Sequence, residues 1–268
     1  MRAAVGLAWI ALLAGCMAVE TPTASSTLRF SPALAEGFDA LPRVVGETPQ
    51  ARAVNAALDR IDVGDREERA SCLEMKRHND NVEWGRSVEA PMIGPRFVSL
   101  VVNRGSYCGG AHPWWSRTPL VFDLETGRPI NWTDWLPPEM ATPIHAEDPD
   151  LGSGPPVLDS PALKAWFAAR VLAEMTEYGR RECAELYAED QRESWGLTAW
   201  PDARAGGLTL QSAGLVHADM GCHAEVVMPL DELKRRGGGR DLIEAIGSGR
   251  RDRLWRNAPP EPERTAAR

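Results

Sequence analysis

The segment from Ser106 to Trp115, with the sequence SYCGGAHPWW, combines side chains suited to contacting a ligand. Its two glycines allow positive φ angles or a close backbone approach at the end of a strand. His112 can contact a ligand there, or hold the turn by capping local backbone groups. Two adjacent tryptophans suit stacking on sugar rings or filling a protein pocket if exposed, and form core if buried. We predict these ligand-binding candidates: Gly109, Gly110, His112, Trp114 and Trp115.

A second group of reactive side chains comprises His217, Asp219, Cys222 and His223. It can be interpreted as a metal cluster or as a Cys/His/Asp catalytic set. A cysteine in a disulfide cannot be a nucleophile, and both histidines lie at expected strand ends, where histidine is ordinary. The chain also has no G-x-S-x-G, P-loop or G-x-G-x-x-G motif. We therefore predict no catalytic residue, no metal site and no cofactor.

Four of the five cysteines are predicted to form two disulfides: Cys72, Cys108, Cys183 and Cys222. An even number of cysteines in an exported chain is typical of disulfide pairing. Three pairings are possible, and we favour Cys72–Cys108 with Cys183–Cys222 because each then joins neighbouring elements. Loop closure would stabilise the fold by ~3–4 kcal/mol per bridge. A four-cysteine zinc site is the alternative, but the chain has no C-x-x-C pair.

The fifth cysteine, Cys16, closes an export signal. A positive Arg2 precedes an apolar run that is too short to span a bilayer and ends in small residues. Leu-Ala-Gly-Cys resembles the bacterial lipobox, in which the cysteine is acylated and becomes the new N-terminus. Two or more acyl chains would give a stable membrane anchor. Because Met17 rather than Asp follows, we expect a protein of the outer membrane that faces the periplasm; an ordinary secretory signal is the alternative.

The formal net charge of −8 bears on partners. Removing residues 1–15 takes away Arg2 and no acid, which leaves −9. This charge argues against nucleic acid and anionic surfaces as partners, and it is compatible with a basic protein.

Elements that would position these residues can be predicted from periodicity. Thr48-Pro49 and Ser160-Pro161 each combine a hydroxyl cap with proline in the first turn, which predicts helix starts. The first helix is expected to break at Gly64-Asp65, with Asp65 capping a second helix. Further helical segments are predicted at 180–193 and 229–236.

Strand-like segments separate these helices. We predict three antiparallel strands at 82–92, 96–107 and 117–124, with Phe97 and Val101 on one face of the middle strand and Val98 and Leu100 on the other. Later strands are predicted as four short segments: 195–200, 208–211, 215–217 and 224–228.

Strands and helices follow one another in blocks, which favours an α+β fold with an antiparallel sheet, helices packed on it and two disulfides. The predicted organisation is a signal peptide at 1–15, a flexible tether at 16–36, a single domain at 37–250 and a disordered tail at 251–268.

Two strings, Tyr107-Cys-Gly-Gly-Ala-His and Phe122-Asp-Leu-Glu-Thr-Gly, carry a family resemblance. The chain resembles the extracytoplasmic domain of RsiV-type lysozyme-sensing anti-sigma factors, which also forms an accessory region of PdaC-type peptidoglycan deacetylases. Weaker matches at Pro42, Asn55 and Pro229-Leu-Asp-Glu-Leu extend the resemblance over residues 40–236. It implies an extracytoplasmic domain that binds lysozyme or another envelope component, and it transfers no catalytic residue. We expect neither parent activity here: an anti-sigma factor needs a sigma-binding part before a membrane span, and a deacetylase needs an H-x-x-x-H metal pair, which the five histidines do not form.

We expect a lipid-anchored, non-enzymatic envelope protein whose partners are the bilayer, through Cys16, and a lysozyme-like basic protein or a peptidoglycan fragment. One alternative is a hydrolase or deacetylase acting on cell-wall glycan, with His112 beside Asp123 and Glu125. Another is a structural envelope protein without a specific ligand.

Overall fold

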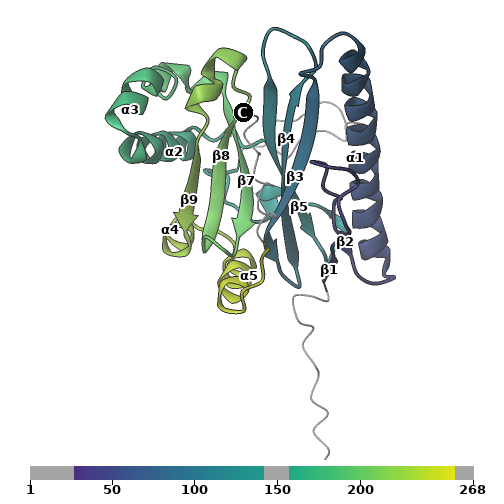
Figure 1. Ribbon diagram of the computed structural model, residues 1–268. Coiled ribbons are helices and arrows are strands. Elements are labelled where there is room, and N and C mark those ends of the chain that lie inside the picture. Colours follow the sequence, from purple (N-terminus) through teal and green to yellow (C-terminus); the bar gives the residue numbers. More distant parts are fainter. Residues whose placement is uncertain (1–26, 142–156, 257–268) are drawn as a thin grey trace, which may run out of the picture.

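The computed structural model describes residues 27–141 and 157–256. Helices and antiparallel sheets combine in one α+β architecture, as the sequence predicts (Figure 1). One sheet has the strand order β3-β4-β5-β6, a second has the order β7-β8-β9, and β1 (Leu28–Arg29) pairs with β2 (Arg43–Val44). The described part of the protein therefore contains two main sheets where the sequence indicated one.

Helix α1 (Pro49–Glu74) begins where predicted, because the Thr48 side chain accepts a hydrogen bond from the Ala51 amide. It does not break at Gly64-Asp65 but runs through this pair to Glu74, with a total length of 26 residues. The prediction of a second helix capped by Asp65 was wrong, because the Asp65 carboxylate instead forms ion pairs with Arg86 and Arg104 in the neighbouring sheet. These ion pairs and the buried face of the helix outweigh the low helix propensity of one glycine.

The first sheet contains β3 (Glu83–Ile93), β4 (Phe97–Tyr107), β5 (Trp114–Asp123) and the short β6 (Arg128–Pro129). All neighbours are antiparallel. The alternation predicted for β4 is confirmed, since Val98 and Leu100 pack in the cluster beneath α1, whereas Phe97 and Val101 belong to the larger core on the other face.

The second half begins with α2 (Pro161–Glu174), which Ser160 caps as predicted. The predicted helix at 180–193 is divided into α3 (Glu177–Cys183) and a 3₁₀ helix, η4 (Glu189–Ser194). The second sheet contains β7 (Gly196–Asp202), β8 (Gly207–Ala213) and β9 (Glu225–Pro229).

Between β8 and β9, residues 215–217 form no strand, and the 3₁₀ helix η5 (His217–Cys222) occupies this connection. After β9, α4 (Leu230–Arg235) matches the predicted short helix. Helix α5 (Arg240–Arg251) was not predicted, although Leu242 and Ile246 are spaced for a buried helical face. Two further 3₁₀ helices are η2 (Met75–Arg77) and η3 (Trp132–Asp134).

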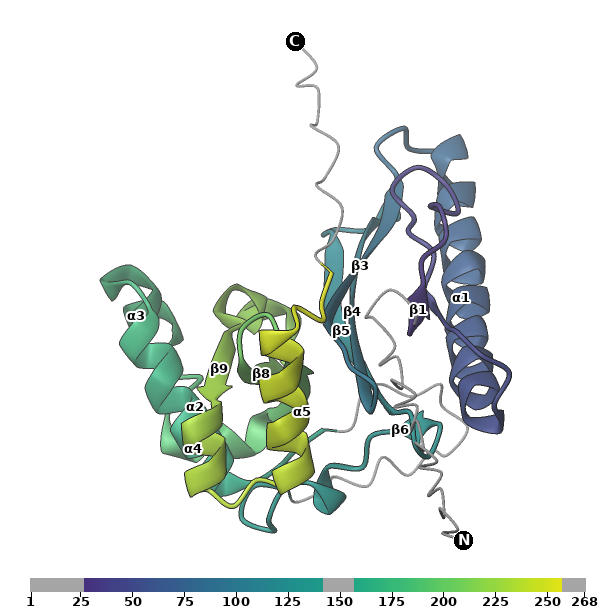
Figure 2. The same cartoon turned by 90° about the horizontal axis from the view of Figure 1, so that it is seen from below.

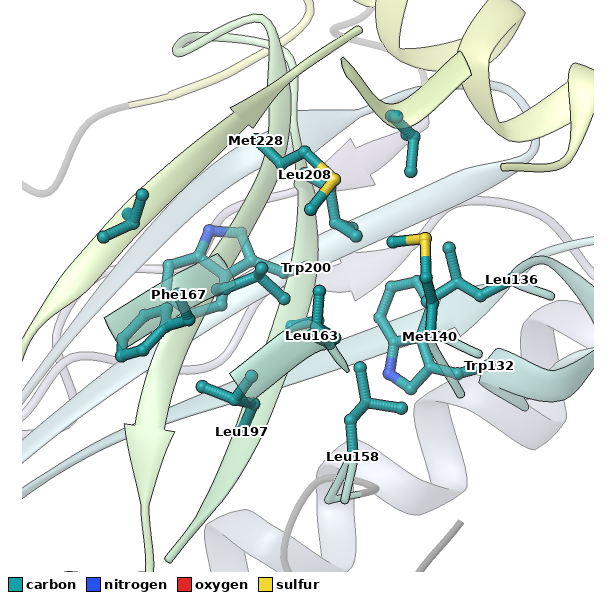
Figure 3. Packing of buried hydrophobic residues seen from close by; sticks show 14 of the residues in the cluster. Trp132, Leu136, Met140, Leu158, Leu163, Phe167, Leu197, Trp200, Leu208 and Met228 are labelled. Atoms are coloured by element: carbon teal, nitrogen blue, oxygen red, sulfur yellow. The ribbon is translucent and has the colours of Figure 1, made fainter. Parts of the chain in front are cut away.

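The elements stack in layers. Helix α1 covers one face of the first sheet, and the second sheet with the later helices lies on the other side (Figure 2). Strand β7 contacts β3, β4 and β5 directly. The larger core includes Trp200 of β7, Phe167 of α2 and Trp132 of η3, as seen from close by in Figure 3.

Both disulfides of the favoured pairing are present. Cys72–Cys108 joins α1 to the end of β4, and Cys183–Cys222 joins α3 to η5. Cys108 thus fixes the start of the 106–115 segment, and Cys222 fixes the end of the 217–223 segment, which are the two candidate sites that the sequence indicates.

The two ends of the domain differ from the sequence expectation. Leu28, in the predicted tether, is buried in the core beneath α1. Arg256, in the predicted tail, pairs with Ala90 of β3 through backbone hydrogen bonds. The predicted signal at 1–15, Cys16 and the first part of the predicted tether, up to residue 26, lie outside the described residues, as do residues 257–268. Within the described ranges, no helix has both the length and the apolar character needed to cross a bilayer.

Candidate functional site

The glycine-rich segment forms an exposed turn between β4 and β5. Gly109 has φ +86°, a left-handed conformation that favours glycine, and Gly110 follows it on the surface. His112 is also exposed on this turn. The Cys72–Cys108 bridge ties the start of the turn to the end of α1.

Trp114 and Trp115 begin β5 rather than belonging to the turn. Trp114 is 46% exposed and Trp115 is 39% exposed, so both rings remain available to a ligand. Their register opposite Ser106 and Gly105 of β4 fixes their backbone at the sheet end. Of the predicted candidates, these two tryptophans line a cavity.

That cavity has a volume of about 300 Å³ and lies between the start of β5 and the second sheet. We call it the tryptophan cavity. Its wall includes residues from β5, β7, β8 and the segment after η5: Trp114, Trp115, Arg117, Thr198, Gln211 and His223. The wall also includes the apolar residues Val157, Leu215 and Met220. Gly109, Gly110 and His112 are not part of this wall.

His223 packs against Trp115 in an edge-to-face arrangement, with ring centroids 4.9 Å apart. Burial, and secondarily the positive charge of Arg117, lower the pKa of His223 below its ordinary value. At neutral pH the imidazole is therefore uncharged and can both donate and accept a hydrogen bond.

Arg117 connects the two sheets beside the cavity. Its Nη1 donates hydrogen bonds to Glu89 Oε1 and Asn103 Oδ1, both at 2.7 Å, and its Nε pairs with Glu225 of β9. Burial alone would raise the pKa of Glu89, but the hydrogen bond and charge of Arg117 outweigh it and lower that pKa. Arg204 also pairs with Glu89, so two cations and two carboxylates meet beside the wall and their charges balance.

Thr198 and Gln211 are directly opposite each other in the β7–β8 register and therefore lie on the same face of the second sheet. Gln211 Nε2 donates to the Arg117 carbonyl of β5 at 2.8 Å, so this face is turned toward the first sheet. Arg117, Thr198, Gln211 and the cavity role of His223 were not predicted. The available signal was the presence of polar residues at alternate positions of otherwise apolar strands.

The geometry separates the residues of the predicted hydrolytic set. His112 precedes β5, whereas Asp123 ends it, and ten residues of strand span ~30 Å. Arg96 forms ion pairs with both Asp123 and Glu125 at that far end. This set therefore cannot act on one substrate atom.

In the candidate group of His217, Asp219, Cys222 and His223, two members are engaged with other residues. His223 faces Trp115, and Cys222 is held in a disulfide. Across the ranges 27–141 and 157–256, no three His, Cys, Asp or Glu side chains are placed to hold a metal ion together.

A second cavity of about 390 Å³ lies on the other side of the 215–222 segment. Glu182 and Glu185 near α3 and Asp219 of η5 contribute carboxylates to its wall, and Leu215 lines both cavities. The Cys183–Cys222 bridge joins its two sides.

The similarity of this chain to known proteins is distant. No family model matches the chain, and no curated protein matches it. A crystal structure of a DUF3298-family member from Bacteroides fragilis is similar with a TM-score of 0.36 and 17% sequence identity, covering 76% of this chain and 75% of that one. It is a distant structural neighbour, and the family resemblance of the two sequence strings stays a prediction.

Proposed function

We propose that this chain is an exported, lipid-anchored envelope protein whose tryptophan cavity binds a saccharide, such as a peptidoglycan fragment. The observation that carries the proposal is the pair of exposed tryptophans at a mainly apolar cavity whose wall also includes a few polar side chains. Indole rings provide a flat apolar surface for the C–H face of a sugar ring. Polar groups on Arg117, Gln211 and His223 are close enough to the same space to contact ring hydroxyls.

Export is supported by the two disulfides, which persist in oxidising compartments. Anchoring rests on the lipobox resemblance at Cys16. Metabolic labelling with palmitate is expected to mark the wild-type protein and not a Cys16→Ser variant. Labelling of the variant would contradict the anchor, and then an ordinary secretory signal would explain export.

Binding without catalysis fits the arrangement better than hydrolysis. A glycosidase needs two carboxyl groups on either side of the scissile bond. Among the described residues, the wall of the tryptophan cavity includes no carboxylate, and Glu89 and Glu225 are engaged by Arg117.

Calorimetric titration of the full chain in detergent with purified peptidoglycan fragments tests the proposal. We expect saturable binding that weakens about tenfold in the Trp114→Ala/Trp115→Ala double variant, because loss of aromatic contact costs ~1 kcal/mol or more. Tyr178→Ala is the matched control, since Tyr178 is 67% exposed and lies on α3 outside the cavity.

Lysozyme provides the contrasting arm of the same experiment. A basic protein would be expected to contact the acidic cavity at Glu182 and Glu185 rather than the tryptophans. Saturable binding of lysozyme together with no binding of fragments would overturn the saccharide proposal in favour of a protein partner.

A further inference from the structure

Two oxygen atoms of the residues that line the tryptophan cavity lack hydrogen-bond partners within the described part of the chain: Thr198 Oγ1 and Gln211 Oε1. Thr198 is 3% exposed and Gln211 is 4% exposed. Buried polar groups are nearly always hydrogen-bonded, because an unpaired one loses its interaction with water without replacement. Two such groups side by side therefore call for a partner.

The Gln211 amide has a defined orientation. Because Nε2 donates to the Arg117 carbonyl at 2.8 Å, the atom left without a partner is the oxygen, which can only accept. Thr198, opposite it in the strand register, supplies a hydroxyl that can donate. Two neighbouring residues of the wall thus carry a shielded acceptor and a shielded donor on the same face of the sheet.

Charge limits which group can satisfy them. Arg117 and Arg204 are matched by Glu89 and Glu225, and His223 is neutral, so the groups beside the cavity carry no net charge to attract an ion. A neutral group with one N–H donor and one carbonyl acceptor is a secondary amide. Apolar atoms of Leu215 and Met220 in the same lining suit a methyl group.

We propose that the tryptophan cavity takes an acetamido sugar, with its amide N–H donating to Gln211 Oε1 and its carbonyl accepting from the Thr198 hydroxyl. Trp114 and Trp115 then contact the sugar ring. Both oxygens are shielded from solvent, so binding includes a small movement of the two side chains that exposes them while the Gln211 Nε2 hydrogen bond to the Arg117 carbonyl is kept. The inference rests on the proposed saccharide function and specifies its ligand.

The first test compares neutral trisaccharides on the wild-type full chain in detergent. Tri-N-acetylchitotriose is expected to bind at least about tenfold more tightly than cellotriose, which has hydroxyls in place of the acetamido groups. Equal affinity would overturn the inference and leave the saccharide function standing. Absence of binding by both trisaccharides and by peptidoglycan fragments would overturn the proposed function itself.

Peptides are the other common source of secondary amides. An N-acetylated, amidated tri-alanine peptide serves as the third ligand, and we expect no saturable binding. If it binds as tightly as tri-N-acetylchitotriose, the cavity is a peptide site and the acetamido-sugar inference is wrong.

Thr198→Val removes the hydroxyl with little change in shape. We expect the variant to have a higher Tm, because an unpaired buried group is lost. We expect it to bind tri-N-acetylchitotriose about tenfold more weakly and to lose less affinity for cellotriose. Unchanged affinity for both sugars would overturn the role of Thr198. The ligand comparison on the wild-type chain tests the inference independently of how the variant folds.

Ser99→Ala is the matched control. The Ser99 hydroxyl in β4 is also buried without a partner among the described residues, but Ser99 is not in the cavity wall. Its removal is expected to raise the Tm likewise and to leave the binding of both sugars unchanged. A loss of affinity in this variant would attribute the Thr198→Val effect to general repacking of the core.

Discussion

Arg86 is a fully buried cation that connects α1 with β3. Its guanidinium pairs with Asp62 at 2.5 Å and with Asp65, and it also donates to the Asp39 carbonyl. Arg104 shares Asp65, so these charges form one network beneath the helix. In such a network every member depends on its partners, because a buried charge without one is poorly solvated.

Removing this cation is expected to be strongly destabilising. Arg86→Met keeps an unbranched, flexible side chain but leaves two buried carboxylates undercompensated, so we expect a loss of ~3–5 kcal/mol in the free energy of unfolding. Urea denaturation measures it. Arg181→Met removes an exposed ion pair with Glu182 and should change stability by less than ~1 kcal/mol. Equal effects of the two substitutions would contradict the network.

His223 should make stability depend on pH. Burial and then the Arg117 charge lower its pKa in the folded state below the ordinary value of about 6.5. The unfolded chain therefore takes up this proton at a higher pH than the folded chain does. Its contribution to the free energy of unfolding accordingly declines as the pH falls below about 6.5.

The His223→Gln variant removes this proton uptake and keeps a polar side chain. Between about pH 7 and pH 5, its free energy of unfolding should decline less than that of the wild-type protein. Urea denaturation at several pH values gives both curves. Parallel curves would mean that His223 titrates alike in the folded and unfolded states.

At the scale of elements, α1 shows how tertiary contacts override a local signal. Gly64-Asp65 is an ordinary helix-ending pair, yet the helix runs through it. Val54 and Leu58 are buried before it, Cys72 is buried after it, and Asp65 is held by two arginines. The helix is thus attached to the sheet on both sides of the glycine.

Glycine at position 64 accordingly lowers the stability of the helix, and replacing it with alanine should raise that stability. An added Cβ would meet no atom within 4 Å, so Gly64→Ala is expected to raise the free energy of unfolding by ~0.5–1 kcal/mol. Gly127→Ala should do the reverse, because Gly127 has φ +70° and its Cβ would lie 2.6 Å from Gln50 Cα. A loss of stability in Gly64→Ala, measured by thermal unfolding, would show that the glycine is needed there.

Elements with strong local signals could be predicted from the sequence, whereas others depended on contacts. Hydroxyl-Pro pairs gave the starts of α1 and α2, and alternation gave β4 with the correct faces. Residues 215–217, predicted as a strand, instead lead into and begin η5. The end of η5 is held by the disulfide from Cys222 to Cys183 of α3. Helix α5 begins directly after three glycines and has no side-chain N-cap, so the sequence offered no start signal of the kind that marked α1 and α2.

At the scale of the whole molecule, the cavity could be predicted only in part. Trp114 and Trp115 were distinctive as adjacent aromatic residues. The opposite wall comes from Thr198, Gln211 and His223, which are distant in sequence and are brought together when the second sheet packs across the first. Sequence periodicity indicates that a strand has two faces but not which other strand each face meets.

The chain beyond α5 closes one edge of the first sheet. Strand β3 is the outer strand of that sheet, and its partners on the open side are short segments from both ends of the domain. Near its start, the Arg86 amide donates to the Gly37 carbonyl. Further along, Ala90 exchanges two backbone hydrogen bonds with Arg256, of 2.9 and 2.8 Å, and the Ile93 amide donates to the Leu254 carbonyl at 2.7 Å. An uncovered strand edge is a template for pairing with other chains.

Residues 254–256 should therefore contribute to both stability and solubility, although composition places them in a tail. We compare a chain that ends at Arg256 with one that ends at Arg253, so that the difference is this segment alone. Three backbone hydrogen bonds at about 1 kcal/mol each predict that the shorter chain loses roughly 3 kcal/mol in urea denaturation. Light scattering should also show concentration-dependent association of the shorter chain, because Ala90 and Ile93 then present unpaired amides at an open edge. Identical unfolding midpoints, together with a monomer mass for each chain at all concentrations, would mean that β3 does not need this cover.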